Sequence, residues 1–305
     1  MTKISVVINT LNEAKNLPRA IASIKNFADE IVVVDMRSDD KTVGVAKKLG
    51  AKVYLHERTS YVEPARNFAI SKVMSQSDSQ RSQWVLILDA DEEVPDTLAQ
   101  KLKESMEKNK GDYFRIPRKN IIFGKWMQHS RWWPDFNIRF FKKGFVSWSE
   151  EIHSVPITKG RGADLEAKEE LAIIHHNYES INEYLERLNR YTSIQSENLK
   201  KQGYKFDWRD LIQKPTKEFL SRFFAAGGYK DGIHGLALSG LQAFSEFVLY
   251  LKLWQKDKFK KEKLDIKEFV SVTKEIKKEI NYWESDALVK EKGSILHRIK
   301  RKFRL

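Results

Sequence analysis

The stretch WVLILDADEE, residues 84–93, joins an uninterrupted apolar run to a cluster of carboxylates. The run from Trp84 to Asp89 is short and rich in Val, Ile and Leu, as is typical of a strand buried on both faces. Asp89 and Asp91 stand at its end with one residue between them, so both carboxylates can reach one site. Hard oxygen ligands of this kind suit Mg²⁺ or Mn²⁺. From the spacing alone, a helix N-cap and a solvated loop are the better interpretation.

Strands and helices alternate upstream of this stretch. Buried strands are predicted over residues 4–8, 30–35, 52–55 and 84–89, and helices over 16–27, 41–49 and 64–74. Apolar strands separated by amphipathic helices predict a parallel sheet covered on both faces, so this part is α/β and Rossmann-like. Such sheets bind ligands beyond the carboxyl ends of their strands. Polar residues gather there: Thr10, Asn12, Glu13, Asp35, Ser38, Asp89 and Asp91.

From residue 112 to 176 the pattern changes to short, aromatic strands. We expect strands over 113–116, 138–141 and 172–174 to complete a mixed sheet, followed by a helix over 178–200. Four tryptophans lie among them and either stack on a sugar ring or, for most of them, fill the core: Trp126, Trp132, Trp133 and Trp148.

The composition changes again near Lys214. Residues 219–254 are dominated by Phe, Leu, Ala and Gly but are interrupted by Glu246 and Lys252. A spanning helix needs roughly 20 nearly uninterrupted apolar residues, so an interfacial helix or a helix pair is the better interpretation. We expect a nucleotide-sugar transferase domain over 1–200 and a helical extension over 201–305.

The chain closes with a basic run: Lys300, Arg301, Lys302 and Arg304. Together with the apolar segment, this run predicts attachment to an anionic membrane surface. A helical hairpin that packs on the catalytic domain, or a dimer contact, explains the same features nearly as well.

Composition limits which classes of protein this chain can belong to. The chain has 305 residues, 41% of them hydrophobic, which suffices for one large domain or a core domain with an appendage. It has no cysteine, which excludes disulfides, thiolate metal sites and cysteine nucleophiles. Nothing at the start resembles a secretory signal, so we expect a cytoplasmic protein. The net charge of +13 points to nucleic acid, an anionic membrane or a phosphorylated substrate, or simply to solubility.

Four motifs in order carry a family resemblance: VVINTLNEAKNL, IVVVDMRSDDKT, EPARNFAI and WVLILDADEEV. Together they closely resemble family 2 glycosyltransferases, which have the GT-A fold. The motifs WPD (133–135), RFF (139–141), EIH (151–153) and HHNY (175–178) are similar to the lipopolysaccharide-core glucosyltransferase-like branch. The resemblance implies inverting transfer of a hexose from a nucleotide-diphosphate sugar to a cell-envelope glycan or lipid-linked acceptor, peripherally at the inner face of the cell membrane. UDP is favoured only by its frequency in the family.

The resemblance also implies roles for single residues. A divalent cation, Mn²⁺ or Mg²⁺, would be held by Asp91 and His175, while His176 points to the opposite face of the strand. The nucleotide would contact Thr10, Asn12, Glu13, Asp35, Arg66 and Asp89.

Inverting transfer needs a carboxylate that takes the proton from the acceptor hydroxyl. We favour Glu151, then Glu150, and expect Trp133 and Asp135 to bind the acceptor. The family often has a carboxylate directly after the histidine of the EIH motif. Ser154 stands there in this chain, so the identity of the base stays open, and both glutamates could simply be surface charges.

The alternative is a basic protein that binds nucleic acid or membrane without transferase activity. No helix-turn-helix, zinc-finger or RNA-binding signature supports a nucleic-acid partner. A dehydrogenase would need GxGxxG after the first strand, and a sugar-nucleotide pyrophosphorylase a Gly-rich basic loop. The chain has NTLNE (9–13) instead, so the sequence favours the transferase.

Overall fold

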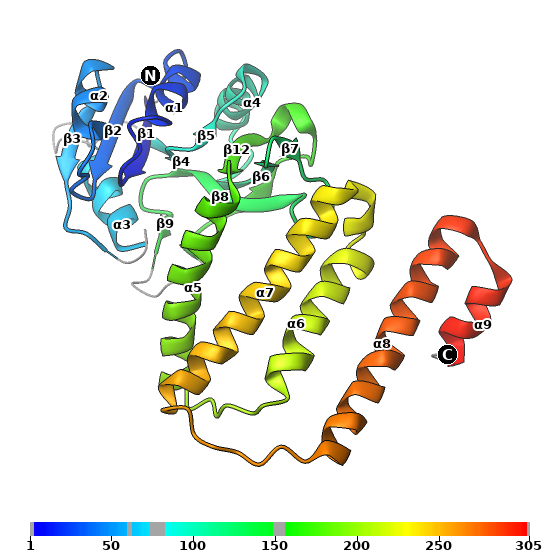
Figure 1. Cartoon of the computed structure of the whole chain (residues 1–305). Coiled ribbons are helices and arrows are strands. Elements are labelled where there is room, and N and C mark those ends of the chain that lie inside the picture. Colours follow the sequence, from blue (N-terminus) through cyan, green and yellow to red (C-terminus); the bar gives the residue numbers. More distant parts are fainter. Residues whose placement is uncertain (1–2, 60–62, 74–82, 149–155, 304–305) are drawn as a thin grey trace. The chain divides into compact units, whose positions relative to one another are not determined.

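The structure is a computed structural model that describes residues 3–59, 63–73, 83–148 and 156–303 (Figure 1). Contacts divide the chain into two compact units. The first contains residues 1–121 and 134–177, and the second contains residues 122–133 and 178–305.

The first unit is built on a mixed sheet with strand order β3-β2-β1-β4-β8-β6-β12-β5, and β11 pairs with β6. Strands β1 to β4 are mutually parallel where they pair, and β8 runs antiparallel to β4 and β6. The α/β class and the mixed sheet are therefore as predicted. The strands are β1 (Lys3–Thr10), β2 (Glu30–Asp35), β3 (Lys52–Leu55), β4 (Gln83–Asp89), β5 (Glu92–Glu93), β6 (Tyr113–Ile122), β8 (Asp135–Lys142), β11 (Gly162–Asp164) and β12 (Ile173–Tyr178), with a separate antiparallel pair β9 (Val146–Ser147) and β10 (Ile157–Thr158).

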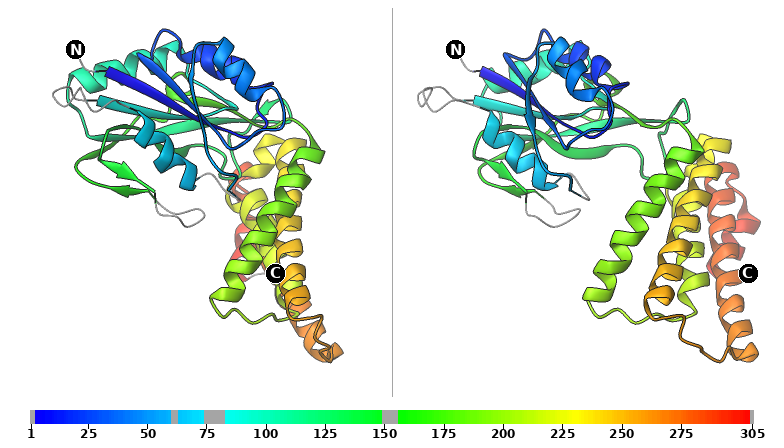
Figure 2. Two further views of the ribbon diagram at one scale, coloured as in Figure 1. Left: turned by 90° about the vertical axis from the view of Figure 1, so that its left-hand side faces the viewer. Right: turned by 60° about the vertical axis from the view of Figure 1, so that its left-hand side comes forward.

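Helices cover both faces of this sheet (Figure 2). Successive side chains of a strand point to opposite faces, so each buried strand feeds two cores. One core joins Val6 and Leu86 to α1 (Leu17–Ile24), α2 (Thr42–Lys48) and α4 (Asp96–Glu107). The other joins their neighbours Val7 and Ile87 to α3 (Glu63–Lys72). A short 3₁₀ helix, η1 (Glu169–Leu171), precedes β12.

The predicted tryptophan cluster does not form a single wall. Trp148 is buried in the core beneath α3, and Trp132 packs on a small core of the second unit. Trp126 and Trp133 are half-buried and meet edge to face, with ring centroids 5.3 Å apart. The core interpretation therefore holds for Trp148 and Trp132.

The second unit is helical. It contains β7 (Lys125–Trp126), α5 (Ile181–Lys201), α6 (Asp210–Leu220), η2 (Ser221–Ala225), η3 (Gly228–Asp231), α7 (Ile233–Lys256), α8 (Ile266–Lys292) and α9 (Ile295–Phe303). Helices α5 and α6 both pack on α7. The contact units thus place α5 with the helices that follow it, whereas the expected domain boundary at residue 200 stays a prediction.

The apolar segment forms α7. Among the described residues it is the one helix that is long and apolar enough to cross a membrane by length and composition. Its Lys252 does not face lipid, because Nζ lies 2.6 Å from the carbonyl oxygen of Asn189 and 2.8 Å from the hydroxyls of Thr192 and Ser193 on α5. The predicted segment 219–254 contains only the end of α6, then η2, η3 and most of α7, so it forms one long helix and not a pair; its location at a membrane stays a prediction.

Candidate active site

Asp35 ties the carboxyl ends of β1 and β2 together. Its carboxylate is fully buried and accepts hydrogen bonds from Thr10 Oγ1 (3.1 Å), Ser38 Oγ (2.6 Å) and the Ser38 backbone N (2.8 Å). The structure therefore brings Thr10 and Asp35 together where the sequence predicted a ligand site. These contacts give Asp35 a role in shaping the turn, and its contact with a nucleotide stays a prediction.

The loop after β1 is held by its own polar side chains. Asn12 has a φ of +59°, a left-handed conformation that asparagine tolerates better than most residues, and its Oδ1 accepts from the Asp39 backbone N at 2.8 Å. Glu13 Oε2 accepts from Asn16 Nδ2 at 2.9 Å, and the Glu13 backbone N donates to Thr42 Oγ1 at 2.8 Å. Both residues lie at the predicted edge of the sheet.

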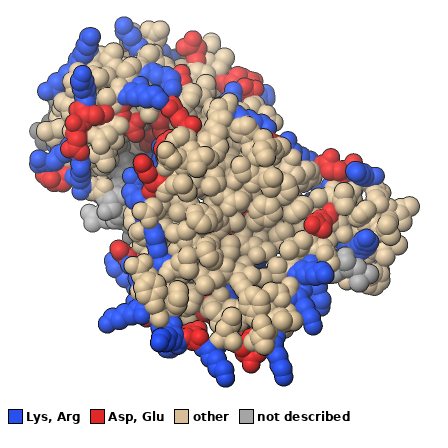
Figure 3. Space-filling view, in the orientation of Figure 1, with Lys and Arg blue, Asp and Glu red and all other residues tan. Residues whose placement is uncertain are grey.

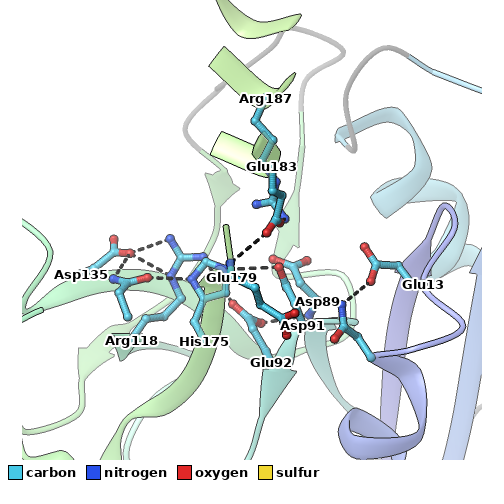
Figure 4. Close-up of polar contacts among 12 residues, drawn as sticks. Glu13, Asp89, Asp91, Glu92, Arg118, Asp135, His175, Glu179, Glu183 and Arg187 are labelled. Atoms are coloured by element: carbon cyan, nitrogen blue, oxygen red, sulfur yellow. Dashed lines mark hydrogen bonds and ion pairs between the residues drawn. The ribbon is translucent and has the colours of Figure 1, made fainter. Parts of the chain in front are cut away.

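A network of buried charges begins at Asp89, at the end of β4 (Figure 4). Asp89 Oδ2 lies 2.5 Å from Arg139 Nη2, and Oδ1 lies 3.5 Å from Arg66 Nη2. Arg139 also contacts Glu92 Oε1 at 2.8 Å, and Glu92 has no exposed surface. Arg118 Nη1 lies 3.3 Å from the same oxygen. Opposite charges thus replace the water that each group has lost.

The network keeps its members ionised. Burial acts to raise the pKa of Asp89, but the charges of Arg139 and Arg66 outweigh it and hold that pKa far below its ordinary value. Burial acts to lower the pKa of Arg139, yet the charges of Asp89 and Glu92 raise it above its ordinary value. Asp89 is therefore an anion that is already shared between two arginines.

Asp91 contacts β12. Its Oδ2 lies 3.5 Å from His175 Nε2, and its carbonyl oxygen accepts from the His176 backbone N at 2.9 Å. His176 Nε2 instead lies 2.6 Å from Glu93 Oε1, as expected for neighbours on a strand. Of the two histidines, the structure thus brings the predicted one to Asp91.

A chain of hydrogen bonds sets the tautomer of His175. Asp135 Oδ2 is bound by Arg118 Nη2 at 2.6 Å and accepts from Asn120 Nδ2 at 3.3 Å. With its amino group turned to that carboxylate, buried Asn120 presents Oδ1 to His175 Nδ1 at 2.7 Å. An amide oxygen can only accept, so Nδ1 carries a proton, and Nε2 is the ring nitrogen that faces Asp91.

This arrangement fits a divalent cation. A carboxylate oxygen and an imidazole nitrogen lie 3.5 Å apart, and both are ligand types that Mn²⁺ accepts. Within the described residues no group of three or more His, Asp or Glu could hold a metal ion. Asp91 and His175 would therefore supply two ligands, leaving the others to water and substrate phosphates, as is usual for Mg²⁺ sites.

Several site residues were not predicted from the sequence: Arg118, Asn120, Arg139, Glu92 and Asn9. Of these residues, Asn9 could have been found from the sequence, because its polar amide stands near the end of a mostly apolar strand. It lies beside Asp89 across the sheet and is only 7% exposed. Within the described part of the chain neither Oδ1 nor Nδ2 has a hydrogen-bond partner, which is uncommon for a buried amide.

Glu150 and Glu151, the candidate bases, lie outside the described residues. Trp148 precedes them, and Asn67 on α3 holds its backbone through Nδ2 to the carbonyl oxygen (2.6 Å) and Oδ1 to the amide (2.9 Å). Arg66, the neighbour of Asn67, lies 5.7 Å from the centroid of the Trp148 ring. Asp135 is bound by Arg118 and Asn120, and its contact with the acceptor stays a prediction.

Comparison with known proteins gives consistent relatives. A sequence profile described as Glycosyl transferase family 2 matches residues 5–159. An uncharacterized glycosyltransferase of Rickettsia typhi is 34% identical over 266 residues, which cover 83% of this chain and 87% of that protein. The lipopolysaccharide core biosynthesis glycosyltransferase LpsC of Rhizobium meliloti is 24% identical over 264 residues, covering 84% and 94%.

Two solved structures show weaker likeness. S. aureus TarS 1-349 has a TM-score of 0.40 and 16% identity, covering 87% of this chain and 94% of its own. Glucosyl-3-phosphoglycerate synthase from Mycobacterium tuberculosis, in complex with Mn²⁺ and UDP, has a TM-score of 0.32 and 21% identity, covering 39% and 44%. Because both TM-scores are below 0.5, these two structures assign no role to any residue of this chain.

The profile spans half of the chain, and the Rickettsia relative matches most of its length. This protein therefore belongs to glycosyl transferase family 2 and is a glycosyltransferase, as its motifs predicted.

Proposed function

We propose that this enzyme transfers a hexose, with inversion, from a UDP-linked sugar to a cell-envelope glycan or lipid-linked acceptor, and that it requires a divalent cation held by Asp91 and His175. The observation that carries the proposal is the position of His175, whose Nδ1 is held by Asn120 and whose Nε2 lies 3.5 Å from Asp91 Oδ2. The similarity to LpsC, whose name places it in lipopolysaccharide core biosynthesis, supports the class of acceptor.

The chain's own residues divide the work around the donor. A cation at Asp91 would neutralise the charge that develops on the leaving nucleoside diphosphate. Arg66 would exchange its long contact with Asp89 for a phosphate oxygen, because a guanidinium suits phosphate geometry. Asn9 would hydrogen-bond the donor with the amide atoms that find no partner among the described residues. Arg139 would stay in place and keep Asp89 and Glu92 oriented.

The general base is proposed from the resemblance as Glu151, with Glu150 second. Asp135 suits this task less well. Burial acts to raise its pKa, but the charge and hydrogen bonds of Arg118 outweigh burial and hold the pKa below its ordinary value. A carboxylate stabilised as an anion in this way is a weaker proton acceptor.

Calorimetric titration of UDP, GDP, TDP and CDP, with and without Mn²⁺, tests the donor site. We expect UDP to bind only with metal, and Asp91→Asn to abolish that binding. Glu93→Gln is the matched control, since Glu93 contacts His176 on the other face of β12 and should leave nucleotide binding intact. The proposal fails if no nucleotide binds under any condition. Metal-dependent binding of another nucleotide would correct the donor base alone.

A further inference from the structure

Helix α9 exposes its apolar residues and none of its residues is buried. Four large side chains are strongly exposed: Ile295 (73%), Leu296 (59%), Ile299 (50%) and Phe303 (62%). An ordinary surface helix turns such residues toward the protein. We call these four residues the α9 stripe.

The stripe is continuous. At 3.6 residues per turn, successive residues are rotated by about 100°, so the four side chains fall within one sector about 100° wide. Lys300 and Lys302, both exposed, flank this sector, one on each side. Arg301 points almost directly away from it.

Helix α9 is attached to the protein through its polar side. Arg301 Nη1 lies 2.8 Å from Asp286 Oδ1 on α8; Asp286 is only 6% exposed, and Lys290 contacts its other oxygen at 2.8 Å. This ion pair fixes which side of α9 meets α8, and therefore which side is left outward. Figure 3 shows uncharged side chains along the outer edge of the helical unit, where Figure 1 places α9, with Lys and Arg beside them.

We propose that the α9 stripe docks into the surface of an anionic lipid membrane. Apolar side chains would enter the boundary between headgroups and acyl chains, while Lys300 and Lys302 extend to the lipid phosphates on either side. Basic residues next to a buried apolar face reinforce attachment to anionic lipids. A membrane matches this pattern better than a second copy of the chain, because that copy carries the same excess of positive charge, +13 overall.

The inference does not depend on the donor site. If the proposed function holds as well, the stripe would bring the enzyme to the surface where a lipid-linked acceptor resides. The two can fail separately, because nucleotide binding is measured without lipid.

Sedimentation of the whole protein with vesicles tests the proposal. We expect binding to phosphatidylglycerol-containing vesicles, weak binding to phosphatidylcholine alone, and release at high salt. The double variant Ile295→Ser/Ile299→Ser should lower the partition coefficient at least tenfold. Its control is Leu55→Ser/Ile157→Ser, which removes side chains that are 59% and 56% exposed in the first unit and should leave partitioning unchanged.

Two further double variants test the contribution of the lysines to lipid binding. Lys300→Gln/Lys302→Gln should weaken binding to anionic vesicles about tenfold or more. Lys47→Gln/Lys48→Gln removes the same charge from exposed positions on α2 and should change binding little. The proposal is overturned if wild type does not sediment, or if each variant matches its control. It is also overturned if wild type is a dimer by light scattering that the stripe variant dissociates without any change in lipid binding.

Discussion

The carboxyl edge of β4 and the helix α9 break the usual distribution of side chains in opposite ways. Next to the partly buried Asp89 at the end of β4, the charged groups of Glu92 and Arg139 are buried, whereas α9 leaves large apolar groups in water. Each arrangement costs free energy unless a partner offsets it. At β4 the partners are opposite charges inside the protein. For α9 no described residue covers the stripe, and the proposed partner lies outside the protein. Departures of this kind are expected at functional sites, and both proposals rest on one.

The largest effect is expected from breaking the buried network. Arg139→Met leaves Glu92 buried without one of its cations, and we expect a loss of about 3–5 kcal/mol in the free energy of unfolding, measured by urea denaturation. Arg115→Met is the matched control, because Arg115 and Asp164 form an exposed pair that should contribute less than about 1 kcal/mol. If both variants lost the same free energy of unfolding, the buried network would stabilise the protein no more than an exposed ion pair does.

The next effect concerns the tautomer of His175. Asn120→Leu removes the acceptor at Nδ1, and we expect Mn²⁺ affinity to fall about 10–100-fold. Nitrogen NMR of the metal-free protein should also show the His175 proton leaving Nδ1. Asn137→Leu, which loses a 3.0 Å contact to Asp135 but none to His175, should change affinity less than about threefold. Unchanged affinity in Asn120→Leu would remove the hydrogen-bond chain from the metal site.

A smaller effect is expected where an ion pair is only partly buried. Arg301→Gln removes the contact that orients α9, and the free energy of unfolding should fall by less than about 1 kcal/mol. Hydrogen exchange should nevertheless rise in α9 and not in α8. Lys302→Gln, on the same helix but without a contact to Asp286, should leave exchange unchanged. Faster exchange throughout α8 would show instead that the two helices unfold together.

The smallest effect is expected from the stripe itself. Ile295→Ser/Ile299→Ser should change the free energy of unfolding by no more than about 0.5 kcal/mol per substitution, because these side chains are exposed. Ile24→Ala, at a fully buried position on α1, should lose about 2–5 kcal/mol in the same denaturation experiment. A large loss of unfolding free energy in the stripe variant would indicate that α9 packs its apolar side chains against the protein.

Much of the fold could be predicted because its signals are local. Strands β2 and β3 cover the predicted residues, since short Val-rich runs between helices have few other interpretations. Strand β6 continues to Ile122, beyond the predicted end at Ile116. The intervening Pro117 disfavours a central strand, yet it is accommodated opposite Phe136 on β8.

The site was predictable only in part. Asp91 and His175 came from motif resemblance, and the structure brings them together. Asn120 and Arg118 carry no local signal, because their partners depend on β6 lying between β8 and β12, and that order is a property of the whole sheet. The α9 stripe was likewise not predicted. The closing segment was interpreted through its basic residues, and the side that faces water depends on the Arg301–Asp286 contact.

The adjacent positions of Arg66 and Asn67 limit which mutations α3 can accept. One residue contacts Asp89 and the other holds the backbone of Trp148, so the register of α3 is fixed by two separate parts of the unit. A one-residue insertion or deletion earlier in the helix would rotate both side chains by about 100° and break both contacts at once. A substitution at an exposed position of α3, such as Ser71, leaves both contacts in place, whereas a change of length before Arg66 does not.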